Sequence, residues 1–221
     1  MTDTTEGTRL RADAQRNLER IVAAAHEVFA EHGPDVPMEE IARAAGVGVG
    51  TLYRRFPDRE SLIRAVGINA FQRVLDNTRT IIRDNSDPWR ALTAMALSTA
   101  DLQVALQLSM LSPRARVIIT RDPETGKIRD ELMDILDSLV DAAQRNGSMR
   151  TDVSSRDVAV LLSLVRRGLH GLPEDLMRSA PPRFLTIMLD GLRAGADTPL
   201  PGRPVTQADL DFLRRSDQAT G

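Results

Sequence analysis

The sequence feature that most restricts the fold is a glycine turn between two short helical patterns at residues 37–62. Residues 38–45 carry apolar side chains at helical spacing, and residues 49–56 do so again. Between them, Gly46 can adopt the left-handed conformation that ends a helix sharply, and Gly48 completes the turn. The stretch is therefore predicted to be a helix-turn-helix, which needs a further helix to bury its apolar faces.

Two longer helical patterns flank this stretch. Residues 11–32 have one apolar stripe and end at a Gly-Pro pair, which predicts a helix that completes a three-helix head. Residues 58–84 predict a fourth helix, with Asp58 as its N-cap. At ~1.5 Å per residue this helix would be about 40 Å long, and the junction between head and body is expected within it.

The remaining strong patterns are also helical. They lie at residues 88–111, 127–145, 155–169 and 182–194, whereas residues 114–126 predict a loop or a short helix. Since no run alternates with the two-residue period of a strand, the predicted fold class is all-α. The expected organisation is a flexible arm at 1–10, a helix-turn-helix domain at 11–64, a helical body at 65–197 and a loose tail at 198–221, in which 207–214 could form a short helix.

Composition narrows the class of protein. The chain has 221 residues, no cysteine and no apolar run near the ~18 residues that a membrane helix needs. We therefore expect a soluble cytoplasmic protein that does not associate with membranes. The net charge of −2 does not favour a nucleic-acid binder, but residues 43–64 contain five arginines against Asp58 and Glu60, which gives a local sum of 5 − 2 = +3.

A short helix of this kind enters the major groove of DNA with its N-terminal end towards the bases. Small residues permit close approach at that end, hydroxyl groups bind phosphates, and arginine binds either phosphate or guanine. The predicted DNA-binding residues are Val49, Gly50, Thr51, Tyr53, Arg54, Arg55 and Arg59.

Other readings of the same residues stay open at this point. Paired short helices also occur in helical adaptors that bind proteins or ligands without binding DNA, where the arginines would form a solvated face. The glycines at 46–50 resemble a phosphate-binding loop, but such loops follow a strand, and here a helix precedes them. The three histidines are scattered and no nucleophile or carboxylate pair stands out, so we expect no enzymatic activity, metal or cofactor.

Residues 16–64 resemble the N-terminal domain of TetR-family transcriptional regulators. The motif G-T-L-Y-x-x-F-P-x-[KR]-x-x-L is matched at Gly50, Thr51, Leu52, Tyr53, Phe56, Pro57, Arg59 and Leu62. The resemblance implies a homodimer that binds a near-palindromic double-stranded operator, with a pocket for an unidentified small molecule in the helical body. It also implies that Thr51, Tyr53 and Arg59 contact phosphates.

Two positions depart from the family pattern. Pro37 stands where the family usually has a Ser or Thr that caps the second helix and touches phosphate, and Glu39 stands where a basic or polar residue is common. Base-specific contacts are expected to come mainly from Arg54 and Arg55, together with DNA shape.

The resemblance also places a pocket and an interface in the body. Candidate pocket residues for a small apolar or amphipathic effector are Phe71, Trp89, Met95, Leu102, Leu106, Met110, Met133 and Leu136. The segment 158–165 is apolar almost all round, as in an interface helix or in a core helix of one subunit. The candidate dimer residues are Val158, Leu161, Leu162, Val165, Leu185, Met188 and Leu192. A repressor released by its effector is the expected mode of action.

Overall fold

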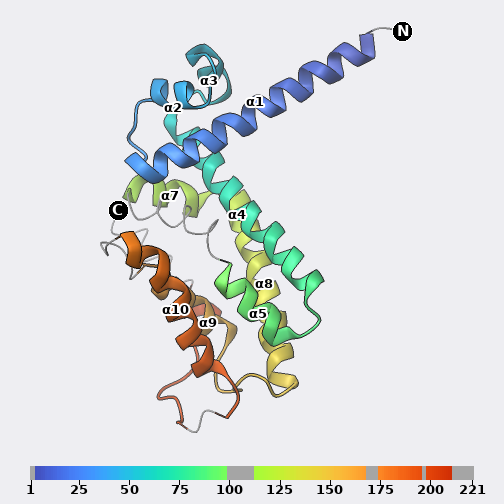
Figure 1. Cartoon of the computed structure of the whole chain (residues 1–221), viewed down its shortest axis with the longest axis vertical. Coiled ribbons are helices and arrows are strands. Elements are labelled where there is room, and N and C mark those ends of the chain that lie inside the picture. The colour runs from blue at the N-terminus through green and yellow to red at the C-terminus, as the bar shows by residue number, and fades with distance from the viewer. Residues whose placement is uncertain (1–2, 99–111, 168–173, 196–197, 211–221) are drawn as a thin grey trace. The chain divides into compact units, whose positions relative to one another are not determined.

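The computed structural model describes residues 3–98, 112–167, 174–195 and 198–210 (Figure 1). Secondary structure in these segments is helical, apart from an isolated antiparallel bridge between Met149 and Arg193. The predicted all-α fold class is confirmed. Within the same segments, no helix is both long enough and apolar enough to cross a membrane.

The helices follow the order predicted from the periodicity, with changes at several ends. In chain order they are α1 (Asp3–His32), α2 (Met38–Ala44), α3 (Val49–Arg55), α4 (Arg59–Asp84), α5 (Pro88–Leu97), α7 (Pro113–Arg121), α8 (Pro123–Arg145), α9 (Ser155–Arg167) and α10 (Glu174–Leu192).

The prediction of a flexible arm at residues 1–10 was wrong from Asp3 onwards, because α1 begins there. Extending an existing helix adds one hydrogen bond per residue fixed, whereas starting one is costly, so a packed helix readily continues into a polar segment.

The segment at 114–126, between the predicted helices at 88–111 and 127–145, contains the short helix that was one of its two predicted forms. It forms α7 and the first turn of α8, so α8 begins four residues earlier than predicted. Ser112 caps α7 by accepting from the Ala115 N–H, and Asp122 caps α8 by accepting from the Thr125 N–H. In both cases a proline follows the cap, where it suits the first helical turn. The predicted helix at 88–111 has α5 as its first part, and residues 99–111 lie outside the described residues.

Two corrections concern the C-terminal part. Helix α10 starts at Glu174, eight residues before the predicted start, and it contains Pro181 and Pro182. Residues 198–210 are not loose, because Val205 N donates to Asp157 Oδ1 at 2.9 Å and Val205 O accepts from Ser154 Oγ at 2.9 Å. These bonds tie the segment to the start of α9. The helical turn at 207–210 coincides with the start of the short helix considered at 207–214, and 211–221 lie outside the described residues.

The chain divides into two compact units, each with its own apolar core. Unit 1 comprises Met1–Gln72 and Val104–Gly126, and unit 2 comprises Arg73–Gln103 and Lys127–Gly221. Both α4 and α8 therefore contribute residues to each unit. The core of unit 1 is built by α1, α2, α3, α4 and α7 through buried side chains that include Phe29, Ile41, Leu52, Leu62 and Ile119.

Helix α7 packs closely on the first half of α4. Gly67 permits this approach, because a Cβ built there would lie 2.8 Å from Ile119 Cγ1. Two ion pairs flank the contact, Arg64 with Asp122 at 3.3 Å and Arg114 with Glu60 at 2.5 Å. The arrangement makes α7 part of the unit that holds the helix-turn-helix.

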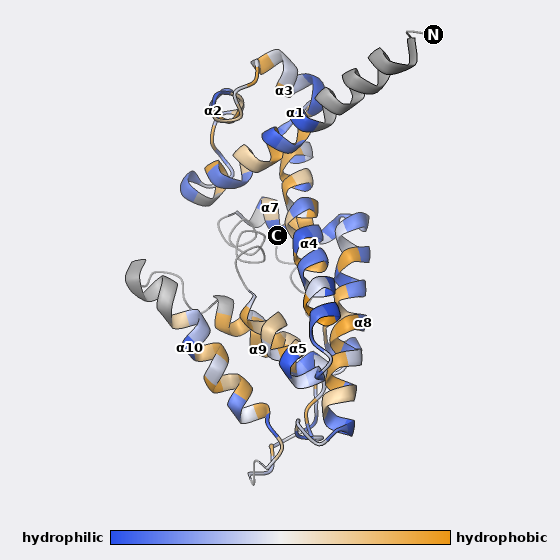
Figure 2. Ribbon diagram, turned by 45° about the vertical axis from the view of Figure 1, so that its right-hand side comes forward, coloured by the Kyte–Doolittle hydropathy of each residue, from blue (hydrophilic) through white to orange (hydrophobic). Residues whose placement is uncertain are grey.

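The core of unit 2 is formed by α5, α8, α9 and α10, with α10 packed on both α5 and α9. Figure 2 shows the alternating polar and apolar bands of amphipathic helices along α4 and α8. At one end of this core the guanidinium of Arg193 lies 5.1 Å from the centroid of the Trp89 ring, which is a cation–π contact.

Replacing Gly67 by alanine tests the α4–α7 contact. Alanine is favoured over glycine inside a helix by about 1 kcal/mol, but overpacking costs roughly 1–3 kcal/mol. We expect the clash with Ile119 to prevail, so that Gly67→Ala lowers the free energy of unfolding measured with urea. Gly126→Ala in α8, where nothing lies within 4 Å of the added Cβ, is the matched control and should not destabilise the protein. Equal effects at both positions would contradict a close α4–α7 contact.

Candidate nucleic-acid interface

The helix-turn-helix is formed by α2, a four-residue turn and α3. Gly46 has φ of +61°, its N–H donates to Arg43 O at 3.1 Å, and Val47 N donates to Ala42 O at 3.0 Å. This pair of bonds is the Schellman motif, which needs a residue such as glycine in the left-handed conformation. The predicted role of Gly46 as the stop of the second helix is confirmed.

Helix α3 is fixed to unit 1 by one side and exposes the other. Leu52 is fully buried and Phe56, its C-cap, is buried as well. The amide N–H groups of Thr51 and Leu52 donate to Gly48 O at 2.8 and 3.1 Å, which starts the helix. Five of the predicted DNA-binding residues are exposed and Thr51 is half-buried; the exposed ones are Val49, Gly50, Tyr53, Arg54 and Arg55.

The structure gives Arg59 a contact that the sequence did not reveal. Its Nη1 donates to the carbonyl oxygen of Pro34 at 2.6 Å and to that of Val36. The side chain is half-buried and holds the loop between α1 and α2. A phosphate contact by Arg59 stays a prediction, and any such contact has to coexist with this loop contact.

Tyr53 also has a partner within the protein. Its hydroxyl donates to Glu39 Oε1 at 3.4 Å, a long hydrogen bond between two exposed side chains. Glu39 and Glu40 lie in the first turn of α2, where the helix dipole favours acidic residues. The N-cap of α2 is Pro37, which makes no side-chain hydrogen bond. The start of α2 therefore presents negative charge beside the tyrosine predicted to bind phosphate.

A further arginine contacts the turn itself, although the sequence analysis assigned it no role. Arg20 of α1 donates from Nη2 to Ala45 O at 2.7 Å and to Gly46 O at 2.9 Å. Both acceptors are backbone carbonyl groups, and they lie 25 and 26 residues after Arg20 in the sequence. Helical periodicity places Arg20 on the polar side of α1 and contains no signal for such a contact.

The start of α4 is capped as predicted. Asp58 Oδ1 accepts from Ser61 N at 2.7 Å, and this hydrogen bond to the backbone lowers the pKa of the Asp58 carboxyl below its usual value. The Asp58 carboxylate thus carries a full negative charge at neutral pH. The exposed cations of the helix-turn-helix are Arg43, Arg54 and Arg55, whereas Arg64 pairs with Asp122.

Two family models match the chain. One describes the bacterial regulatory proteins of the tetR family and matches residues 21–66, which include α2, α3 and the start of α4. The other describes the C-terminal domain of SbtR-like transcriptional regulators and matches residues 87–194. The chain belongs to the TetR family. It is accordingly a transcriptional regulator with a DNA-binding helix-turn-helix domain and a ligand-binding C-terminal domain, in a family whose members bind DNA and dimerise.

Individual proteins agree with this assignment. An uncharacterised HTH-type transcriptional regulator of Mycobacterium tuberculosis is 33% identical over 150 residues, which cover 66% of this chain and 76% of that protein. The crystal structure of the TetR regulator SCO0520 from Streptomyces coelicolor is 34% identical, with a TM-score of 0.63, and the match covers 81% of this chain and 99% of that one. A TetR regulatory protein from Mycobacterium vanbaalenii is 32% identical with a TM-score of 0.59, over 84% and 99% of the two chains.

The candidate pocket residues do not form one group. Trp89 and Leu136 are buried in the core of unit 2, and Met95 and Met133 pack against that core half-buried. Phe71 instead packs against the core of unit 1. Leu102, Leu106 and Met110 lie outside the described residues.

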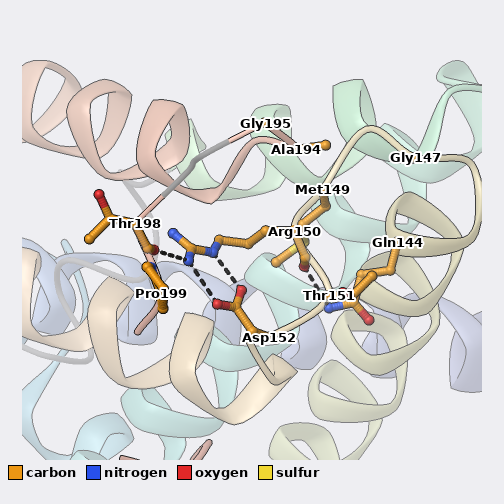
Figure 3. A pocket seen from close by; sticks show the side chains of 10 residues that line it. All are labelled: Gln144, Gly147, Met149, Arg150, Thr151, Asp152, Ala194, Gly195, Thr198 and Pro199. Atoms are coloured by element: carbon orange, nitrogen blue, oxygen red, sulfur yellow. Dashed lines mark hydrogen bonds and ion pairs between the residues drawn. The ribbon is translucent and has the colours of Figure 1, made fainter. Parts of the chain in front are cut away.

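Unit 2 also has a surface hollow of about 520 Å³ between the end of α8 and the segment after α10 (Figure 3). Arg150 lies in it and donates from Nε and Nη2 to the two Asp152 carboxylate oxygens at 2.6 and 2.8 Å, and from Nη2 to Thr198 O at 2.9 Å. The Arg150 guanidinium is thus used to hold this segment in place. None of the described pocket candidates lines the hollow.

The candidate dimer residues divide into two groups. Val158, Leu162, Leu185 and Leu192 are buried within one chain, where they form part of the core of unit 2. Leu161, Val165 and Met188 are half-buried against the same core. Val158 and Leu162 therefore fit the alternative of a core position in one subunit, and Leu185 and Leu192 are covered by the same core. Among the residues of α9 and α10 whose side chains are described, 155–165 and 180–192, the exposed large apolar ones are Leu164, Phe184 and Ile187.

Substitution of Glu39 tests whether its charge opposes DNA binding. Two unit charges 4 Å apart in water interact with an energy of about 1 kcal/mol, and a change of that size in the binding free energy is roughly a fivefold change in affinity. We expect Glu39→Gln to tighten binding to duplexes of any sequence by roughly that factor at low salt, in fluorescence anisotropy titrations. Glu124→Gln, in the first turn of α8, is the control and should leave affinity unchanged. Unaltered or weaker binding by Glu39→Gln would contradict the opposing role.

Proposed function

We propose that this TetR-family chain is a repressor that binds a near-palindromic operator as a homodimer and is released by a small apolar or amphipathic effector. The observation that supports it most is the exposed face of α3, held outwards by the burial of Leu52 and Phe56 on the opposite face. This arrangement fixes a short helix at the surface with its polar residues facing solvent, as groove binding requires.

The residues of α3 divide by chemistry. Val49 and Gly50 are small and exposed at its N-terminal end, where bases would be approached most closely. Thr51 and Tyr53 carry hydroxyl groups suited to phosphates. Arg54 and Arg55 are exposed, lie in the last turn and have no ion-pair partner among the described residues, so that either is able to pair with guanine.

The proposed dimer interface uses the exposed apolar residues of α9 and α10. Phe184 and Ile187 lie three positions apart on one side of α10, whereas Leu185 and Leu189 on the other side are buried within the chain. Leu164 of α9 is 58% exposed and Ile187 is 60% exposed. A contiguous patch of exposed apolar side chains, unlike single exposed residues, is typical of surfaces that a partner covers. Two such helices from each chain would form a four-helix bundle.

Helix α4 is the proposed route from effector to operator. It is continuous from Arg59 to Asp84, and its residues belong to unit 1 up to Gln72 and to unit 2 from Arg73. An effector that favours one tilt of α4 would change the distance between the two α3 helices of a dimer. Because these must span one major-groove turn of ~34–36 Å or a multiple of it, a small change suffices to misplace one of them.

Selection of bound duplexes from a random pool is the direct test. The proposal predicts a near-palindromic consensus whose half-site spacing matches a dimer. Enrichment of single half-sites would contradict the dimer, and a lack of enrichment would favour the alternative of a helical adaptor that does not bind DNA.

Substitutions in α3 separate base reading from phosphate binding. Tyr53→Ala should weaken binding to the selected and to scrambled duplexes alike, because phosphates carry no sequence information. Arg54→Ala or Arg55→Ala should reduce discrimination between the two duplexes by about 1–3 kcal/mol for at least one arginine. Arg83→Ala, at an exposed position of α4 in unit 2, controls for the lost charge. Losses that are equal on both duplexes for all three variants would exclude a base-reading role.

The interface is tested by introducing charge at Ile187. Fully burying an isoleucine side chain is worth about 1.5–3 kcal/mol, and a symmetric dimer contains the residue twice. Ile187→Asp is therefore expected to raise the dimer dissociation constant at least about tenfold in sedimentation velocity experiments. Leu200→Asp, which changes an exposed leucine outside α9 and α10, should leave it unaltered. A dimer that tolerates Ile187→Asp as well as Leu200→Asp would place the interface elsewhere.

A further inference from the structure

The turn between α2 and α3 is held from outside by Arg20. Its Nη2 is 2.7 Å from Ala45 O and 2.9 Å from Gly46 O. Ala45 and Val47 of the turn contact the core of unit 1, but the N-cap of α3 is Gly48, which makes no side-chain hydrogen bond. The Arg20 guanidinium of α1 thus adds side-chain hydrogen bonds to the backbone of the turn.

Gly46 and Arg20 fit each other closely. A Cβ at Gly46 would lie 2.9 Å from Arg20 Nη2, so a side chain there would displace the guanidinium. Gly46 is therefore required for its positive φ, and its missing Cβ also leaves room for the Arg20 guanidinium. The cation also lies at the C-terminal end of α2, where the helix dipole favours positive charge.

An arginine suits this contact better than a lysine. The planar guanidinium is rigid, and hydrogen bonds to it lose less side-chain freedom than bonds to a flexible ammonium group. A second nitrogen, Nη1, donates weakly to Asn17 Oδ1 at 3.5 Å, one turn earlier on α1. The three acceptors of the Arg20 guanidinium, in Asn17, Ala45 and Gly46, all belong to unit 1.

The position of α3 depends on these two carbonyls. Only Val47 and Gly48 separate Gly46 from Val49, the first residue of α3. Base contacts require α3 to enter the groove in one register, whereas non-specific binding rests on phosphate charge and tolerates displacement. A loosened turn would therefore affect the two kinds of binding unequally.

We propose that Arg20 is a positioning residue for sequence recognition: it fixes the α2–α3 turn and thereby the entry of α3 into the groove, without contacting DNA itself. This inference rests on the sequence-specific operator binding proposed above. It assigns part of the discrimination between duplexes to a residue of α1 that lies outside the recognition helix.

Binding of Arg20→Ala and Arg20→Lys to two duplexes tests the inference. One is the duplex that the wild-type protein selects from a random pool, and the other is a scrambled duplex of the same length and composition. Loss of a preorganised geometry worth 1.4 kcal/mol lowers affinity about tenfold. We expect Arg20→Ala to bind the selected duplex about tenfold more weakly and the scrambled one unchanged. Arg20→Lys should lie between wild type and Arg20→Ala, because its ammonium group retains donors for a carbonyl oxygen.

The salt dependence distinguishes positioning from direct contact. A phosphate contact contributes about one to the slope of log K against log salt, so its loss would reduce the slope by about one. For Arg20→Ala the slope should equal that of the wild-type protein, with active fractions determined by stoichiometric titration. A reduced slope with equal loss on both duplexes would make Arg20 a phosphate contact and overturn the inference. Unchanged affinity for the selected duplex would overturn it as well.

Hydrogen exchange of the free protein provides a test that needs no DNA. Amides at residues 45–52 should exchange faster in Arg20→Ala, while those around Leu62 in the core of unit 1 keep their protection. Arg83→Ala is the control for the lost charge and should leave both regions unchanged. If the wild-type protein selects no duplex, the proposal of sequence-specific operator binding is wrong. The exchange data still decide whether Arg20 holds the turn, and unchanged exchange at 45–52 would show that it does not.

Discussion

The left-handed backbone at Gly46 is the constraint on which the recognition element depends. It ends α2 through two hydrogen bonds and redirects the chain within three residues into α3. Leu52 and Phe56 can then reach the core formed by α1, α2 and α4 while the opposite side of α3 stays exposed. A longer or looser turn would let α3 rotate about its axis, and burial of Leu52 alone would not fix its direction.

The surface around α3 carries both positive and negative side chains rather than a simple excess of positive charge. Arg59, Arg64 and Arg20 are all engaged with carbonyl groups or Asp122 inside unit 1. The exposed cations near α3 are fewer than the sequence suggests, and Glu39 opposes them from α2. Such a surface would bind non-specific DNA weakly, so discrimination between sequences would rest more on geometry than on charge. This is the setting in which the orientation of α3 matters most.

The parts that sequence analysis predicted well have local signals. The turn at Gly46, the cap at Asp58 and the buried face of α3 each follow from residues within one or two turns of helix. The start of α8 has such a signal too, an Asp-Pro pair at 122–123, which lies within the segment predicted as a loop or a short helix.

Tertiary contacts had no comparable signal. Residues 158–165 are apolar on nearly every side, so periodicity could not tell which side the chain's own core covers, and Val158 and Leu162 proved to face that core. The exposed Leu164 of α9 and Ile187 of α10 differ from their buried neighbours in position and not in chemistry. Arg20 and Arg59 bind carbonyl groups more than 20 residues away, and a carbonyl group is present at every residue. Such contacts become visible only when the fold is known.

The attachment of α7 bears on how a signal would reach the operator. Helices α4 and α8 both continue from unit 2 into unit 1, and at their unit 1 ends the N-cap of α8, Asp122, is paired with Arg64 of α4. The contact between Gly67 and Ile119 and the pair between Arg114 and Glu60 hold α7 on the same part of α4. A change in the direction of α4 alone would have to break these contacts, one of which involves a buried carboxylate. Movement of α4, α7 and the helix-turn-helix together breaks none of them. We therefore expect an effector to change the placement of unit 1 as a body and to leave the geometry of α3 within it intact.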